Sequence, residues 1–269
     1  MTYRQRRAYW KAQTRKLQAA ERRYLPDVQR ALTREVERFL REAQDVGFQT
    51  AFRSLRIVND ELLGVINRLH KRVAMQFGMD TNRKLTADRK VSFFNANFIL
   101  SITEILTRQA LDLLTLVEQT TKDRILEVLT QQTMEQWSFA RTAERITELV
   151  ASPSRALTIT RTESNRAANL ASLEAARLQP FEVVKEWISG IDNRTRRFRE
   201  KDEFDHAILD GRRAELDEPF TQMGSKGIQA VAQCPCDPAA PAAFTINCRC
   251  TLGYENKRDA QGRLIPKRG

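Results

Sequence analysis

Apolar residues recur every three or four positions from residue 1 to about 178, a spacing that predicts amphipathic helices. One stripe runs from Val28 to Ala43, a second from Leu62 to Phe77, and a third from Phe98 to Val117. Each stripe covers only one face of its helix. We therefore expect these helices to bundle with one another or with helices of a partner.

Three short segments predict where the helices end. Leu25–Asp27 contains a proline and is expected to close a basic helix over 3–24 and to start the next one. Thr120–Asp123 predicts a break within the long apolar region that follows. Ser152–Ser154 predicts a stop and a new N-cap.

The composition changes after Pro180. Phe181–Ile188 is rich in β-branched and aromatic residues and predicts a strand, and Cys250–Tyr254 predicts a short final strand. Between them, a helix is expected from Lys201 to Leu209, closed by Gly211.

These elements predict an α+β fold in three parts. A long, mostly helical region with a basic arm occupies 1–150, and a small domain with a short sheet occupies 151–256. A basic tail over 257–269 is expected to be frayed. The hydrophobic fraction of 41% supplies a core and excludes wholesale disorder.

The charge is strongly positive. Lys and Arg number 45 against 34 Asp and Glu, which gives a net charge of +11. Such an excess favours a polyanionic partner such as DNA, although solvated helix faces explain it equally well. Within the basic arm, the candidate phosphate-binding residues are Arg4, Arg6, Arg7 and Lys11.

The chain carries no pattern of a membrane protein or a secreted protein. The apolar stretch from Phe98 to Val117 is interrupted by Glu104, Arg108 and Asp112, so it is not expected to span a bilayer. No apolar segment follows the N-terminal arginines. We therefore expect synthesis in the cytosol and no membrane partner.

The segment Arg161–Asn169 combines a polar pattern with alanines. On a helix, Arg161 and Asn165 lie four apart, as do Thr162 and Arg166, so the polar groups form two adjoining rows. The alanines from 167 onwards allow another element to approach closely. Taken alone, the segment is typical of a packing helix with a solvated polar face.

A second polar group follows the predicted strand. Asp192 and Asn193 are typical of a turn, and His206 lies among acidic residues. An Asp192/His206 pair could perform acid–base chemistry. However, no serine or cysteine nucleophile has a recognisable setting nearby, so we expect a structural histidine and no catalytic residues.

Four cysteines form the pattern C-x-C-x11-C-x-C at Cys234, Cys236, Cys248 and Cys250. Structural zinc sites usually leave two to four residues within each pair, so the one-residue gaps argue against a metal. We expect no stoichiometric zinc and no cofactor, with Cys248 and Cys250 packed on one face beside Trp187 or His206. A zinc site made by all four cysteines is the alternative.

In this order, the motifs resemble the Mu F-like head-morphogenesis domain of tailed phages, the family of minor head proteins, over about residues 130–255. Two features depart from the family pattern: the stretch from Arg197 to Asp205 is longer, and Cys234 and Cys236 are additional. The matching positions are Arg161, Thr162, Glu163, Trp187, Asp192, Arg194, Thr195, Arg196, His206, Leu209, Asp210, Gly211, the Asp237-Pro238 loop, Asn247, Cys248, Arg249 and Cys250.

The resemblance implies a structural minor head protein and not an enzyme. Such a protein is present in few copies per particle. It associates with the portal protein and the inner capsid, first in the host cytoplasm and then in the virion, where it acts in assembly and in DNA packaging or delivery. Two alternatives stay open: an enzyme or effector with a hydrolytic or metal site at Asp192, His206 and the cysteines, and a plain nucleic-acid-binding protein, which explains the charge but not the ordered motifs.

Overall fold

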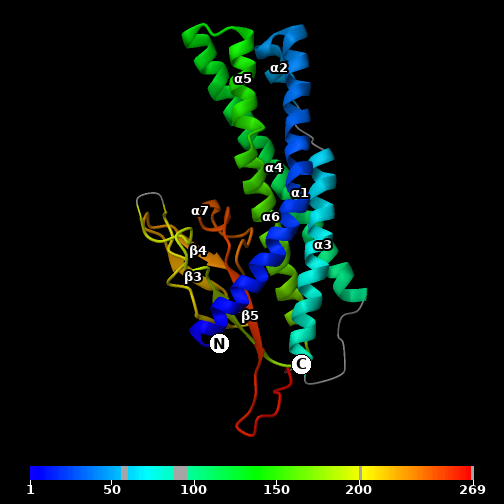
Figure 1. The fold of residues 1–269 in the computed structure, drawn as a ribbon, viewed down its shortest axis with the longest axis vertical. Helices are drawn as coiled ribbons and strands as arrows, with labels where there is room; N and C mark the ends of the chain where they lie inside the picture. The colour runs from blue at the N-terminus through cyan, green and yellow to red at the C-terminus, as the bar shows by residue number, and fades with distance from the viewer. Residues whose placement is uncertain (56–59, 88–95, 200–201, 268–269) are drawn as a thin grey trace. The chain divides into compact units, whose positions relative to one another are not determined.

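The computed structural model describes residues 1–55, 60–87, 96–199 and 202–267, and its fold is α+β, as predicted (Figure 1). Helices come first and small antiparallel sheets follow. The elements are α1 (Tyr3–Val46), α2 (Phe48–Ser54), α3 (Asp60–Leu85), α4 (Ala96–Glu135), α5 (Phe139–Val150), α6 (Pro153–Arg177), β1 (Val183–Ile188), β2 (Arg213–Glu215), β3 (Phe220–Met223), β4 (Gln229–Ala232), α7 (Ala242–Thr245) and β5 (Thr251–Asn256).

The chain forms two compact units, each assembled from distant segments. The mixed unit contains Met1–Ala20, Leu69–Leu106 and Arg161–Gly269, and the helical unit contains Glu21–Arg68 and Thr107–Thr160. These units cut across the boundaries that the sequence suggested at residues 150 and 256. The basic arm and a central helical segment belong to the same unit as the C-terminal sheets.

The helical unit is built from the predicted apolar stripes. Leu32 and Ile66 are completely buried in it, which confirms that these stripes face a core. Phe48 of α2 stacks on Phe139 of α5 with ring centroids 4.7 Å apart, so these two helices lie side by side (Figure 1). The Gln29 amide donates to the Ala151 carbonyl at 2.5 Å and ties α1 to the end of α5.

The predicted helix break at Pro26 is wrong, because α1 continues through it. A proline inside a helix removes one backbone hydrogen bond and costs about 3 kcal/mol. On either side of it, however, Tyr24 and Val28 are buried. The continuous apolar stripe keeps the chain helical despite the lost bond.

The predicted break at Thr120–Asp123 is also wrong, because α4 runs unbroken from Ala96 to Glu135. Thr120 and Thr121 donate their hydroxyl protons to the carbonyls of Leu116 and Val117, each at 2.7 Å. Such bonds satisfy the hydroxyls within the helix and destabilise it only slightly. In contrast, the predicted stop at Ser152–Ser154 is confirmed, and the Ser152 hydroxyl accepts the Arg155 N–H at 3.3 Å.

The mixed unit holds a three-stranded antiparallel sheet in the order β2-β1-β5 and a two-stranded hairpin of β3 and β4. Both predicted strands are confirmed as β1 and β5. In their register Trp187 lies opposite Leu252. Trp187 is completely buried, and its ring packs edge-on against Phe220 with centroids 5.2 Å apart. It forms the centre of this core.

The predicted helix over 201–209 is wrong. Lys201 lies outside the described residues, and the rest of the segment forms bends and turns. The His206 N–H donates to the Arg196 carbonyl instead of to a carbonyl one helical turn back, and the Asp205 carboxylate accepts the Ala207 N–H. Gly211, with φ of 84°, closes these turns and donates its N–H to the Trp187 carbonyl at 2.8 Å.

The C-terminal tail is not frayed over its described part. The Ile265 N–H donates to the Lys257 carbonyl, and the Ile265 carbonyl accepts the Glu182 N–H at 2.9 Å. The Lys267 N–H donates to the Pro180 carbonyl at 2.9 Å. The tail therefore turns back and pairs with the segment that enters β1.

Replacing Leu32 with Ala tests the core of the helical unit. Leu32 is completely buried, so the change should lower the free energy of unfolding by about 2–5 kcal/mol. The matched control is Leu126→Ala, because Leu126 is 51% exposed and its change should stay within about 0.5 kcal/mol. Denaturant unfolding measures both, and equal losses would contradict this assignment of the core.

Candidate functional site

The polar rows of the Arg161–Asn169 segment are buried in the mixed unit. The expectation of a solvated face is therefore wrong: Glu163 and Ser164 have no exposed surface, and Asn165 and Asn169 are 2% exposed. The alanines allow α6 to approach closely, as expected, with Ala167 completely buried. α6 thus presents polar side chains to the inside of the unit.

These side chains hold the backbone that leads into β5. The Asn165 amide donates to the carbonyls of Cys248 and Cys250 at 2.9 and 3.1 Å. The Asn169 side-chain oxygen Oδ1 accepts the Leu252 N–H at 3.2 Å. Because buried backbone groups must be paired, these two asparagines fix the path of the C-x-C segment.

Two more residues of α6 fix Asn247, the residue just before the C-x-C segment. The Thr162 hydroxyl accepts the Asn247 N–H at 2.9 Å, and Arg161 donates to the Asn247 side-chain oxygen at 2.9 Å. Asn247 has a positive φ of 63°, a conformation that asparagine tolerates better than most residues. Three residues at family positions are therefore in direct contact, since Asn247 bonds both Arg161 and Thr162.

Glu163 is the buried centre of a charged group. Its carboxylate accepts from Arg166 and lies 3.0 Å from Nε2 of His70 on α3. Burial acts to raise the pKa of Glu163, but the Arg166 guanidinium and His70 hold it below its usual value. Arg166 also donates to the Cys236 carbonyl at 3.1 Å.

Asp192 organises the turn after β1. Its carboxylate accepts two bonds from Arg249, at 2.8 and 3.0 Å, and one from the Arg194 N–H at 3.0 Å. Partial burial acts to raise the pKa of Asp192, but these bonds and one from Thr195 lower it to about 2. Arg249 therefore bonds both oxygens of this carboxylate, and the described residues contain no Asp192–His206 hydrogen bond.

Asp210 connects the basic arm to the motif. Its carboxylate accepts from Arg6 at 3.1 Å, from Arg7 at 2.6 Å and from the Ser189 N–H at 2.9 Å. Arg6 also pairs with Glu186 of β1 at 3.3 Å. Two of the four candidate phosphate-binding residues are thus ion-paired within the mixed unit, whereas Arg4 and Lys11 are exposed.

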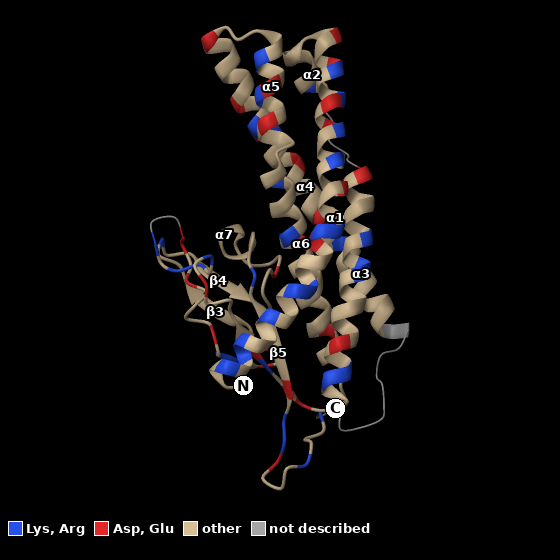
Figure 2. Cartoon of the chain, viewed as in Figure 1, with Lys and Arg blue, Asp and Glu red and all other residues tan. Residues whose placement is uncertain are grey.

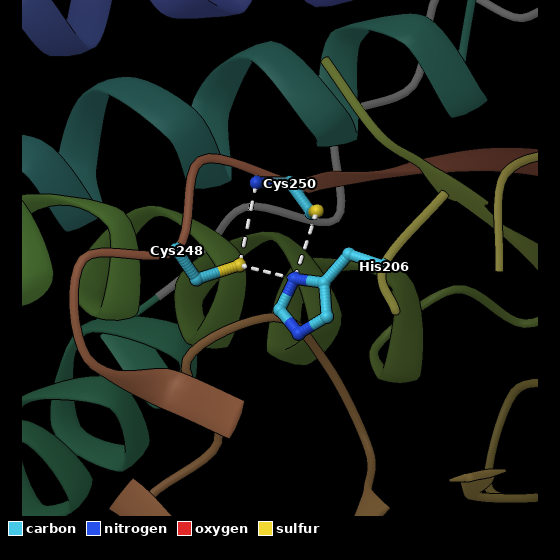
Figure 3. Close-up of side chains that lie close together, drawn as sticks. All are labelled: His206, Cys248 and Cys250. Atoms are coloured by element: carbon cyan, nitrogen blue, oxygen red, sulfur yellow. Dashed lines mark hydrogen bonds between the residues drawn. The ribbon is translucent and has the colours of Figure 1, made fainter. Parts of the chain in front are cut away.

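His206, Cys248 and Cys250 meet at one point (Figure 3). Both sulfur atoms lie 3.5 Å from Nδ1 of His206, which confirms that the two cysteines lie together beside this histidine. Contact with the neighbouring Cys236 thiol, with burial, raises the pKa of Cys248 to about 12, and burial raises that of Cys250 well above its usual value. Protonated, buried thiols are poor nucleophiles.

The four cysteines do not form one cluster. Among the described residues, the group with metal-binding spacing contains Cys248 and Cys250 but not Cys234 or Cys236. The Cys236 sulfur accepts from Asn165 at 3.4 Å and donates to the Thr245 carbonyl at 3.4 Å. The geometry therefore gives no support to a site of four cysteine ligands.

A hollow of about 160 Å³ opens beside this cluster. Its wall includes all three residues of the cluster together with Arg194, Arg196 and Asp202. Arg196 donates to the carbonyls of Phe244 and Ile246, so part of its guanidinium group is already hydrogen-bonded.

Sequence reasoning missed two buried ionisable residues. His70 lies on the apolar stripe of α3, beside Leu69, and that position was the signal for burial. Lys185 lies two positions before Trp187 in β1, so both point to the same face. Burial lowers the pKa of Lys185 to about 8, and its ammonium donates to the Gln233 side chain at 2.7 Å.

Residues 123–253 match the family described as Phage Mu protein F like protein. The match includes every motif position from Arg161 to Cys250 and agrees with the extent expected from the sequence. The chain has no match among curated proteins and none among solved structures.

Glu163→Gln tests the buried charged group. Leaving Arg166 without its carboxylate should lower the free energy of unfolding by about 3–5 kcal/mol. Because the folded pKa of Glu163 is lowered, its contribution is complete above the usual value of 4.5 and is lost as the pH falls through the folded pKa. Unfolding curves over this acid range should therefore be less pH-dependent in the variant.

The matched control for this experiment is Glu218→Gln, which removes an exposed carboxylate from the same unit. It should leave both the stability and its acid dependence close to those of the unmodified protein. If Glu163→Gln behaved like this control, Glu163 would not be charged in the folded state.

Proposed function

Residues 123–253 belong to the Phage Mu protein F like family of phage head morphogenesis, and from this membership we propose that the chain is a structural minor head protein. It acts in capsid assembly and in DNA packaging or delivery, and it binds the portal protein and the inner capsid. It is present in few copies per particle. The family associates the chain with the virion, and no described helix is both long and apolar enough to cross a membrane.

The motif geometry supports a structural role over an enzymatic one. Several polar residues of the pattern are occupied by partners: Asp192 by Arg249, Asp210 by Arg6 and Arg7, and Thr162 by the Asn247 N–H. Catalytic groups need an approach for substrate. These contacts instead hold distant segments of the mixed unit together, which is the observation that carries the proposal.

The helical unit supplies the portal-binding surface in this proposal. Its longest element, α4, exposes large apolar side chains: Leu116 is 64% exposed, Leu126 is 51% exposed and Met134 is 80% exposed. Large apolar side chains left exposed on a surface can mark a protein-binding site. The portal protein is the partner we assign because the family acts in head morphogenesis.

The DNA contact rests on the exposed charges of the arm. Figure 2 shows Lys and Arg positions along the first half of α1. Arg4 and Lys11 are exposed, whereas Arg6 and Arg7 are engaged by Asp210. We therefore assign non-specific phosphate contact to Arg4 and Lys11, and a structural role to the other two.

Leu116→Asp tests the portal surface. The change should weaken co-purification of the full chain with the portal protein of the same phage at least about tenfold, since it places a charge in an apolar contact. The control is Thr147→Asp, which adds the same charge at an exposed position of the same unit on α5. The full chain is required because a cut at residue 150 would divide both compact units. If both variants bound the portal protein equally well, α4 would not be part of the interface.

Arg4→Gln combined with Lys11→Gln tests the DNA contact. Affinity for duplex DNA should fall with salt with a log–log slope of about 0.9 per contacted phosphate, so the double variant should flatten the slope by about 1.8. Lys226→Gln removes an exposed charge elsewhere in the mixed unit and should leave the slope unchanged. A slope near zero in the unmodified protein would show that the arm does not contact phosphates.

A further inference from the structure

We propose that His206, Cys248 and Cys250 bind one zinc ion, with a water molecule from the adjoining hollow as the fourth ligand. The inference does not depend on the proposed function. It also reverses the expectation of metal-free thiols, which rested on the one-residue gaps between cysteines. The reversal comes from the arrangement of the donor atoms, which the spacing of the cysteines along the chain does not reveal.

The donors have the separations that zinc requires. Zinc lies about 2.3 Å from a cysteine sulfur and about 2.0–2.1 Å from a histidine nitrogen, so tetrahedral coordination places sulfur and nitrogen about 3.5 Å apart. Both sulfur atoms lie 3.5 Å from Nδ1 of His206. All three donor atoms lie within 4.8 Å of one another (Figure 3).

The surroundings of the Cys248 sulfur also suit a thiolate. The Cys250 N–H donates to the Cys248 sulfur at 3.4 Å. Hydrogen bonds to ligating sulfur stabilise its negative charge and hold the ligand in place. On binding, the ion replaces the two thiol protons, which pass to solvent, and two thiolates and one neutral imidazole remain.

The backbone around the donors is already fixed without a metal. Asn165 holds the carbonyls of both cysteines, and the Arg196 carbonyl and the Ser189 hydroxyl hold the backbone of His206. His206 is 2% exposed, and its Nε2 atom has no hydrogen-bond partner among the described residues. Nδ1, directed at the two sulfurs, is therefore the nitrogen with a defined partner. Bound zinc would link the turns around residue 206 to the segment that enters β5.

Water in the adjoining hollow would supply the fourth ligand. All three ligands belong to the wall of the 160 Å³ hollow, which has room for water. Sites with two thiolates, one imidazole and one open position are known for zinc. Soft sulfur donors also select zinc over magnesium or calcium.

Metal titration of the full chain tests this assignment. The protein is stripped with a chelator under reducing conditions and titrated first with Co²⁺, as a coloured substitute, and then with Zn²⁺. We expect one metal per chain, the absorption bands of tetrahedral cobalt, a sulfur-to-cobalt charge-transfer band with the intensity of two thiolates, and displacement by Zn²⁺. Zinc should also raise the melting temperature.

Three variants and one control identify the ligands. Cys248→Ser, Cys250→Ser and His206→Asn should each weaken zinc binding at least about tenfold. The control Cys234→Ser changes another completely buried cysteine and should bind as the unmodified protein does. If a variant fails to fold, as judged by circular dichroism, the thiolate count of the unmodified protein decides. Absence of tetrahedral cobalt bands, a count of four thiolates, or equal loss in Cys234→Ser would each overturn the proposal.

Discussion

The mixed unit depends on one requirement: the buried backbone from residue 247 to 252 must find hydrogen-bond partners. A sheet of three short strands cannot supply them all, because this segment has only β1 beside it once it becomes β5. Thr162, Asn165 and Asn169 of α6 supply part of the remainder. Trp10 and Tyr9 of α1 donate to the carbonyls of Arg249 and Leu252. Unpaired backbone groups in a core cost several kcal/mol in total. The position of α6 and the path of this segment therefore depend on each other.

The two asparagines reach this backbone from one face of α6. Asn165 and Asn169 are four residues apart, so their side chains lie one above the other on the helix. Ala167 lies two residues from each of them and is buried on the opposite side of the helix. The polar row and this alanine therefore serve different contacts of the same helix.

The arginines serve a related purpose in the same unit. Arg249, Arg166, and the pair Arg6 and Arg7 each engage a carboxylate from another part of the chain or another turn of a helix. Charged groups at partly or fully buried positions are tolerated only when paired in this way. These pairs leave the net charge of +11 unchanged, because that figure already subtracts the acidic partners, but they engage Arg6 and Arg7 within the unit.

The sequence by itself determined the helical stripes, the strands β1 and β5, the α+β class and the family, because each of these is encoded by short-range spacing or by an ordered set of motifs. Only the tertiary structure decided that α1 passes through Pro26, that residues 202–210 form turns and that the polar row of α6 is buried. It also decided that Arg6 meets Asp210, 204 positions away, and that His206 meets Cys248. The physical reason is the same in each case. A local pattern reports the preference of a segment in water, whereas these outcomes depend on partners that folding brings from distant parts of the chain.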